Sequence, residues 1–185
     1  PLPVIVLADV SGSMSANAAL AVRKDEAAGR FARAGVPHRR IEAWHYTDLK
    51  SRVDADLPVA GAYDGAGLSA ANPFAGIEAD TLVFANGAYQ ADLSHVTAEP
   101  AIEIVALDDA APDWAREALG AKAGTAMSDL ALARMMGGVA VRVSHNFEAK
   151  RPIHLVFLGR SAAPASRHSR VVVVLGTNAA LTLLE

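Results

Sequence analysis

Three oxygen-bearing side chains near the start of the sequence have the types and spacing of a metal site. Asp9, Ser11 and Ser13 follow the apolar stretch 3–8 and form an Asp-x-Ser-x-Ser pattern. One carboxylate and two hydroxyls on a loop after a strand are hard oxygen ligands of the kind that suits Mg²⁺. The pattern indicates a candidate magnesium site, provided that other loops supply the remaining ligands.

This pattern resembles the metal-ion-dependent adhesion motif of von Willebrand factor A domains. The resemblance implies further Thr and Asp ligands, held by a doubly wound parallel sheet in which helices alternate with strands. The sequence lacks that alternation. A Mg²⁺-dependent binding module that uses Asp9, Ser11 and Ser13 is therefore kept as the alternative function, and residues 1–16 are treated as an atypical N-terminal segment.

Other residues that could hold a metal or act as nucleophiles are absent or scattered. The chain has no cysteine, so it offers neither a disulfide nor a thiolate ligand for zinc or an iron–sulfur cluster. No nucleophile elbow, phosphate loop or paired-carboxylate motif is present. The histidines, which are not spaced as a ligand cluster, are His38, His45, His95, His145, His154 and His168. We expect no catalytic residue, and no cofactor bound by this chain alone.

Length and charge limit the number of domains and the kinds of partner that the protein can have. At 185 residues the chain can form one core or two small subdomains. Its 17 basic and 20 acidic residues give a net charge of −3 with the two signs mixed, which argues against nucleic acid as a partner. The apolar run 3–8 is too short to cross a bilayer and does not look like a secretory signal, so we expect a cytoplasmic protein without a membrane partner.

Residues 35–49, GVPHRRIEAWHYTDL, combine charged and aromatic side chains in one short stretch. Trp44 and Tyr46 suit an anchoring role in which their ring N–H and O–H groups reach polar partners. The charged members can form an ion-pair lattice around the rings, and Thr47 can cap a short helix that follows. A structural role and partner docking both remain open. The residues concerned are Arg39, Arg40, Glu42, Trp44, Tyr46, Thr47 and Asp48.

Apolar periodicity and breakers predict the elements around this segment. Residues 17–34 form a helix, with Asn17 as its N-cap and Gly35 as its stop. Residues 57–80 are rich in Ala, Gly, Pro and Asn and are expected to be a loop or linker. Strands follow at 81–85 and 101–107, with a tight turn at Asn86-Gly87. Helices follow at 112–123 and 128–136, the second of them ending at Gly137-Gly138.

Four short β-rich runs without intervening helices occupy the rest of the sequence, at residues 139–143, 153–158, 170–175 and 180–184. Such spacing is typical of a sandwich, a meander or the first coils of a β-solenoid. The last run is not followed by a closing element, so we expect a truncated domain that self-associates through its open β-layer.

The motifs together resemble the SufB/SufD family, and within it the start of SufD proteins. In residues 35–49 the resemblance rests on an Arg-Arg-x-Glu-x-Trp-x-Tyr-Thr-Asp-Leu run, and in residues 82–94, LVFANGAYQADLS, on the strand and Asn-Gly-x-Tyr turn. Residues 170–185 are similar to the strands with which that family enters a right-handed parallel β-helix. The likeness covers residues 21–185, with Ala133 in place of an expected asparagine.

This resemblance implies a non-catalytic scaffold subunit of the SUF iron–sulfur cluster assembly complex, present here as an N-terminal fragment. Its partners would be a SufB-like subunit and a SufC-like ATPase. The histidine that the family is thought to use near the cluster lies beyond Glu185, so no catalytic residue is carried over.

The predicted fold class is α+β, with an N-terminal helical and α/β region that leads into the first coils of a truncated right-handed parallel β-helix. The expected parts are a helical region at 17–56, a loop or linker at 57–80, a small α/β region at 81–138 and the start of the β-helix at 139–185.

Overall fold

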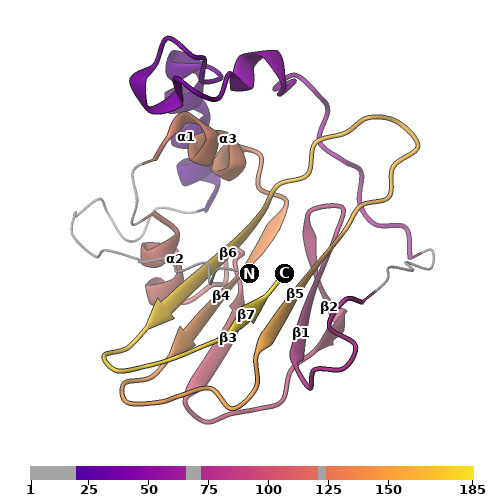
Figure 1. Cartoon of the computed structure of the whole chain (residues 1–185), viewed down its shortest axis with the longest axis vertical. Coiled ribbons are helices and arrows are strands. Elements are labelled where there is room, and N and C mark those ends of the chain that lie inside the picture. The colour runs from indigo at the N-terminus through magenta and orange to yellow at the C-terminus, as the bar shows by residue number, and fades with distance from the viewer. Residues whose placement is uncertain (1–19, 66–71, 121–123) are drawn as a thin grey trace.

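The computed structural model describes residues 20–65, 72–120 and 124–185. Within them the chain forms two β-sheets that face one another, with three α-helices against the outer face of one sheet (Figure 1). The helices are α1 (Leu20–Ala34), α2 (Asp113–Gly120) and α3 (Ala126–Ala133), and η1 (Glu42–Trp44) and η2 (Leu49–Ser51) are single 3₁₀ turns. The strands are β1 (Asp80–Ala85), β2 (Ala88–His95), β3 (Ile102–Ala106), β4 (Gly137–Val143), β5 (Ile153–Leu158), β6 (Ser169–Leu175) and β7 (Leu183–Leu184).

The last four strands alternate between the two sheets. One sheet has the order β2-β1-β5-β7 and the other the order β3-β4-β6. β4 pairs in parallel with β6, and β5 with β7, so each strand pairs with the strand after next in the sequence. The register of β4 with β6 is constant from Gly137 opposite Ser169 to Val143 opposite Leu175. Consecutive turns of the chain are therefore stacked on one another.

The corner between the two sheets stacks in the same way. The backbone N–H of Asn146 donates to the carbonyl of Thr177 at 2.8 Å, and the side-chain amide of Asn178 donates to that of Asn146 at 3.0 Å. Both asparagines have positive φ, 55° and 57°, a conformation that Asn tolerates better than most residues. The two side chains form an asparagine ladder between the stacked corners.

Glycines allow this close stacking. A Cβ at Gly138 would lie 2.5 Å from the carbonyl oxygen of Arg170, and one at Gly176 would lie 2.6 Å from the backbone nitrogen of His145. The prediction that Gly137-Gly138 ends a helix is wrong, because α3 already ends at Ala133 and the two glycines open β4. Glycine is required here by the approach of the next strand.

The β1–β2 hairpin contains the predicted strand and turn. Asn86 and Gly87 both have positive φ, 51° and 95°, as a two-residue hairpin turn requires, and the prediction of a tight turn is confirmed. β2 was not predicted. Its register slips opposite β1, and the hydroxyl of Ser94 fills the gap by accepting from the N–H of Val83 at 2.9 Å and donating to the carbonyl of Gln90 at 2.7 Å.

Most of the other predicted elements are confirmed. α1, β3, α2, α3, β4, β5 and β6 lie where the sequence indicated them, and the last predicted strand is reduced to β7. Gly35 ends α1 with a φ of 69°, whereas Asn17 lies outside the described residues. In the described parts of residues 57–79 only one bridge, between Val59 and Ser166, interrupts the loop. The right-handed parallel β-helix stays a prediction.

The inner faces of the sheets enclose the first of two apolar cores. Because side chains alternate along a strand, every second residue of each strand points into this space. Leu82 and Phe84 of β1 meet Val139 and Val141 of β4 across it, and all four are almost completely buried. This core fixes which face of each strand is turned inward.

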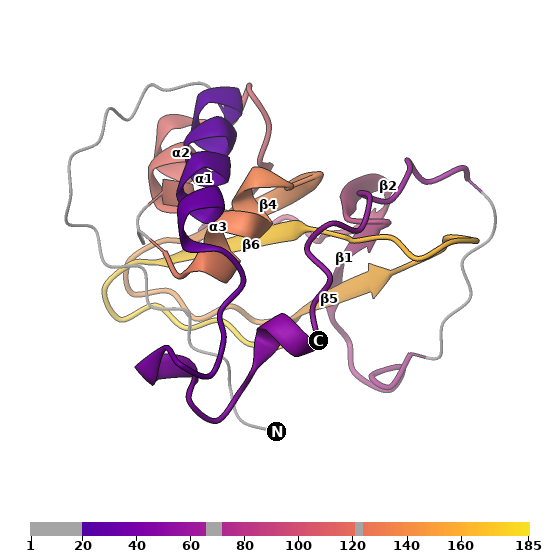
Figure 2. The same ribbon diagram turned by 90° about the horizontal axis from the view of Figure 1, so that it is seen from above.

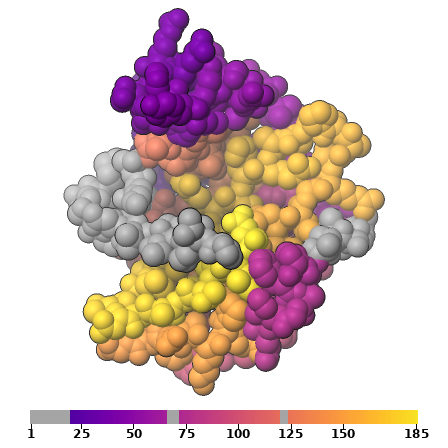
Figure 3. Space-filling view, viewed as in Figure 1, coloured from indigo at the N-terminus to yellow at the C-terminus, as the bar shows by residue number. Residues whose placement is uncertain are grey.

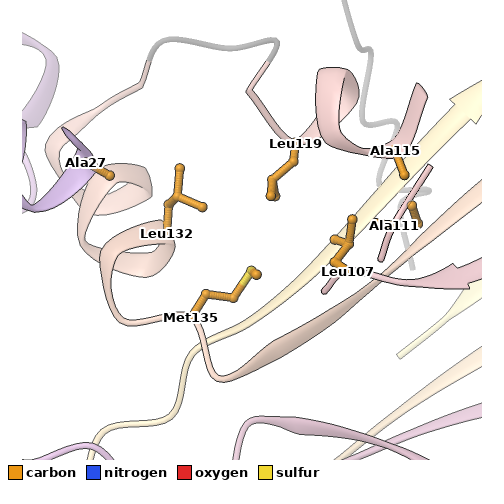
Figure 4. Packing of buried hydrophobic residues seen from close by; sticks show 8 residues of the cluster. Ala27, Leu107, Ala111, Ala115, Leu119, Leu132 and Met135 are labelled. Atoms are coloured by element: carbon orange, nitrogen blue, oxygen red, sulfur yellow. The ribbon is translucent and has the colours of Figure 1, made fainter. Parts of the chain in front are cut away.

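The second core lies between the helices and the outer face of β4 and β6. Figure 2 shows the helices gathered beside these two strands, away from β1 and β2. Ala140 of β4 points out of the sheet into this layer, next to Leu107. Figure 4 shows how Ala27 of α1, Leu132 of α3 and Leu119 of α2 converge there.

Cations of α1 attach this helix to the other two. The guanidinium of Arg30 donates to Oδ1 of Asp129 on α3, with Nε and Nη2 each at 2.9 Å. The ammonium of Lys24 donates to the carbonyl of Met135 at 2.7 Å, and Arg23 donates to the carbonyl of Arg116 on α2. Asp129 is a buried carboxylate, so Arg30 satisfies a charge that water reaches poorly.

We predict that Arg30→Met lowers the free energy of unfolding by about 1–3 kcal/mol, because it keeps the aliphatic stem but removes the guanidinium that hydrogen-bonds to the buried Asp129 carboxylate. Arg33→Met on the same helix, where the guanidinium is exposed, should change it by less than about 0.5 kcal/mol. Urea denaturation of both variants provides the measurement. Equal effects would contradict the assigned role of Arg30.

Candidate functional site

The residues singled out from the sequence form a projecting lobe between α1 and the first sheet. This lobe, called here the 33–52 segment, contains η1 and η2 and stands at the top of the molecule in Figure 3. It begins with the last two residues of α1, and Gly35 then terminates the helix, with the N–H of Gly35 donating to the carbonyl of Phe31 at 2.7 Å. The segment therefore starts from a helix that is itself tied to α2 and α3.

Backbone hydrogen bonds define the course of the 33–52 segment. The N–H of Trp44 donates to the carbonyl of Ile41 at 2.8 Å, and the N–H of Thr47 donates to that of Trp44 at 2.9 Å. The N–H of Lys50 then reaches back to the carbonyl of Pro37 at 3.0 Å. Pro37 is buried, and this last bond closes the 33–52 segment into a loop.

The side chains of this lobe do not form the predicted ion-pair lattice. Arg39, Arg40 and Glu42 are exposed and make no ion pair with any described residue, and neither does Asp48. One oxygen of Asp48, Oδ1, is shielded from solvent and has no hydrogen-bond partner in the described part of the chain. The structure thus places these four residues on one short segment without pairing their charges.

The aromatic residues and the predicted cap also differ from expectation. Tyr46 is 97% exposed, and its ring touches that of His45 edge-on at a centroid distance of 4.9 Å. Trp44 is half-buried. Thr47 is not the side-chain cap, because Asp48 precedes the 3₁₀ turn η2 and makes no side-chain capping bond. Tyr46 is therefore a surface group rather than an anchor.

Asn86 is a connecting residue that sequence reasoning assigned only to a turn. Its side-chain amide donates to the carbonyl of Gly61 at 3.1 Å, and its Oδ1 accepts from the N–H of Arg160 at 2.8 Å. The side chain of Arg167 approaches the same oxygen at 3.4 Å. Asn86 thereby joins the hairpin turn to two distant loops. The Asn-Gly pair predicted the turn, but nothing local in the sequence indicated the contacts of the Asn86 side chain.

The histidines of the described residues do not assemble into a metal site, since no group of three or more His, Asp or Glu side chains in ligating positions occurs there. His168 is distinctive for its environment. Burial lowers the pKa of its imidazole below the ordinary value, and the nearby Arg134 guanidinium lowers this pKa further. Its Nε2 is shielded and has no described hydrogen-bond partner.

The residues of the alternative magnesium site, Asp9, Ser11 and Ser13, lie outside the described residues. The fold of the described part does not support that alternative, because successive strands follow one another from β4 to β7 without helices between them. None of the helices described is long and apolar enough to span a membrane.

The chain was compared with protein-family models and with curated proteins. No protein-family model matches the chain. An iron–sulfur cluster assembly SufBD family protein of Synechocystis sp. is 33% identical over 159 residues, which cover 81% of this chain and 35% of the relative. The chain thus spans about a third of the length of that protein. This similarity supports the family indicated by the sequence motifs, without distinguishing SufD from SufB.

We predict that stability falls with acidification because of His168. The pKa of this residue is lower in the folded protein than its unfolded value of about 6.5, so protons bind preferentially to the unfolded chain. The contribution is fully present above about pH 6.5 and is lost as the pH falls through the folded pKa. Urea denaturation at several pH values between about 7 and 5 gives the free energy of unfolding at each pH. This free energy should fall less steeply with decreasing pH in His168→Gln than in the unsubstituted protein.

The exposed His95 supplies the control for this experiment. His95→Gln should keep the pH dependence of the unsubstituted protein, because the side chain of His95 has no described partner. The same slope in His168→Gln and the unsubstituted protein would show that other groups cause the pH dependence.

Proposed function

We propose that this chain is an N-terminal portion of a SufD-like scaffold subunit of the SUF iron–sulfur cluster assembly complex. The observation that carries the proposal is the 33% identity, over 81% of the chain, to the Synechocystis protein of the SufBD family. The motif of residues 35–49 and the Asn-Gly hairpin turn add support, since both resemble the start of SufD proteins.

The proposed role is non-catalytic and cytoplasmic, with the cluster as cargo. This chain has no cysteine, so thiolate ligands for a cluster would come from other parts of the assembly. A SufB-like subunit and a SufC-like ATPase are the proposed partners of the whole protein. The chain itself supplies a rigid base of two sheets and a helical layer.

We further propose that the stacked strands begin a right-handed parallel β-helix. Three features support this: the alternation of β4 to β7 between the sheets, the constant register of β4 with β6, and the ladder from Asn178 to Asn146. Each new coil would bury the apolar row of the one before it.

The β-helix proposal predicts that residues following Glu185 in the full-length gene product pair in parallel with β6 and extend β7 along β5. An experimental structure of the full-length product would test this directly. Antiparallel pairing along β6, or a helix laid over that edge, would contradict it.

For the 33–52 segment we propose partner docking rather than a purely structural role. The exposure of Tyr46, Arg39 and Arg40 supports this, since side chains that hold a fold together are normally buried or paired. Tyr and Arg are also enriched where proteins bind each other.

The scaffold proposal predicts that the full-length gene product co-purifies with the SufB-like and SufC-like subunits of the same genome. After co-expression with one affinity tag, size-exclusion chromatography should give a single complex that contains all three chains. A preparation of the two partner subunits alone is the control. Elution of the full-length product apart from both partners at micromolar concentration would count against the proposal.

A further inference from the structure

Cations without an intramolecular partner are concentrated on the 33–52 segment. Among the described lysines and arginines, those whose side chains make no ion pair or hydrogen bond with a described residue are Arg33, Arg39, Arg40, Lys50, Arg52 and Lys150. All but Lys150 belong to this lobe, and each of them except Arg33 lies beyond the end of α1. Five cations on the lobe face two anions, Glu42 and Asp48, in a chain whose net charge is −3.

Elsewhere the fold uses its cations internally. Arg30 pairs with Asp129, Arg142 with Glu103, and Arg151 with Asp80. Lys24 and Arg134 donate to backbone carbonyls. Apart from Lys150, only the cations of the lobe have no partner within the described chain, and they contribute positive potential to its surface.

Apolar and aromatic groups accompany these charges. Tyr46 is 97% exposed and Ile41 is 40% exposed. Trp44, which lies between these two residues in the sequence, is half-buried. Tyr, Trp and Arg are the residues most enriched at binding hot spots. The backbone hydrogen bonds to Ile41 and Pro37 already order the lobe, so a partner would pay little conformational entropy to bind it.

We infer that the 33–52 segment binds an acidic surface of a partner protein, with Tyr46 as its apolar contact and Arg39, Arg40 and Lys50 as its charge contacts. This inference rests on the proposed function, because it specifies the chemistry of the docking surface proposed above. A protein is favoured over nucleic acid or an anionic membrane for two reasons. Glu42 lies among the cations, and the negative chain as a whole repels a polyanion.

The test compares charge reversal at two exposed cations. Arg40→Glu on the lobe and Lys150→Glu elsewhere change the charge equally, and neither side chain has a described partner to lose. Isothermal titration calorimetry of the full-length gene product would measure its Kd for the SufB-like subunit and for the SufC-like ATPase, at low and at raised salt. Thermal melting of each variant checks that it is folded.

We expect Arg40→Glu to weaken binding to one of these subunits by about tenfold, while Lys150→Glu leaves the Kd within about twofold. Tyr46→Ala should weaken the same interaction by about tenfold or more. Raised salt should weaken binding of the unsubstituted protein more than that of Arg40→Glu. Salt screens the attraction between Arg40 and the acidic surface, and the variant has already lost this attraction.

Other results would overturn the inference in distinguishable ways. Binding that is equally tight in every variant and insensitive to salt would refute the acidic docking surface while leaving the scaffold role intact. No binding by the unsubstituted protein would refute both. Arg40-dependent binding to duplex DNA or to phosphatidylserine vesicles, with subunit binding unchanged, would replace the protein partner with a different polyanion.

Discussion

The structure depends on parallel pairing between strands that are not neighbours in the sequence. β4 can pair with β6 along its whole length only if the intervening chain crosses to the other sheet and returns at the same height. That requirement explains the local details. Gly138 and Gly176 have no side chain because the backbone of Arg170 and that of His145, respectively, pass within contact distance, and Asn146 and Asn178 adopt left-handed backbone to turn the corner. A larger residue at either glycine would collide with backbone that cannot move aside.

The helical layer connects the 33–52 segment to the sheets and so determines where this segment lies. Ala27 is the fully buried residue of α1 and Leu20 packs against the same core, and charged contacts add to this attachment. Arg30 and Lys24 reach α3 and the chain just after it, which leads directly into β4. The orientation of the 33–52 segment is thus linked to the sheet through the packing of α1 against α3, the Arg30–Asp129 ion pair, and the hydrogen bonds of Lys24 and Arg23 to backbone carbonyls.

Sequence patterns predicted the elements well and the site poorly, for a physical reason. Alternating β-branched residues and the Asn86-Gly87 turn are local signals, and every strand except β2 was predicted from them together with the turn. The partners of Arg30, Asn86 and Ser94 are set by tertiary structure, and no local pattern indicates that Arg30 reaches Asp129, 99 residues further along the chain. Trp44 and Tyr46 suggested an anchor by type alone, and only the accessible area of Tyr46 separates anchor from surface group.

The parallel pairing of β1 with β5 has a consequence for biosynthesis. Leu82 lies beside Leu155, so a ribosome must release the intervening chain before β1 acquires that neighbour. Until then the hairpin has one apolar face and one unpaired edge in water, and a hairpin alone is at most marginally stable. Non-local pairing of this kind slows folding and lengthens the time during which nascent chains can aggregate. The slipped, serine-bridged register of β2 makes the opposite edge irregular, which disfavours misjoining of newly made chains there.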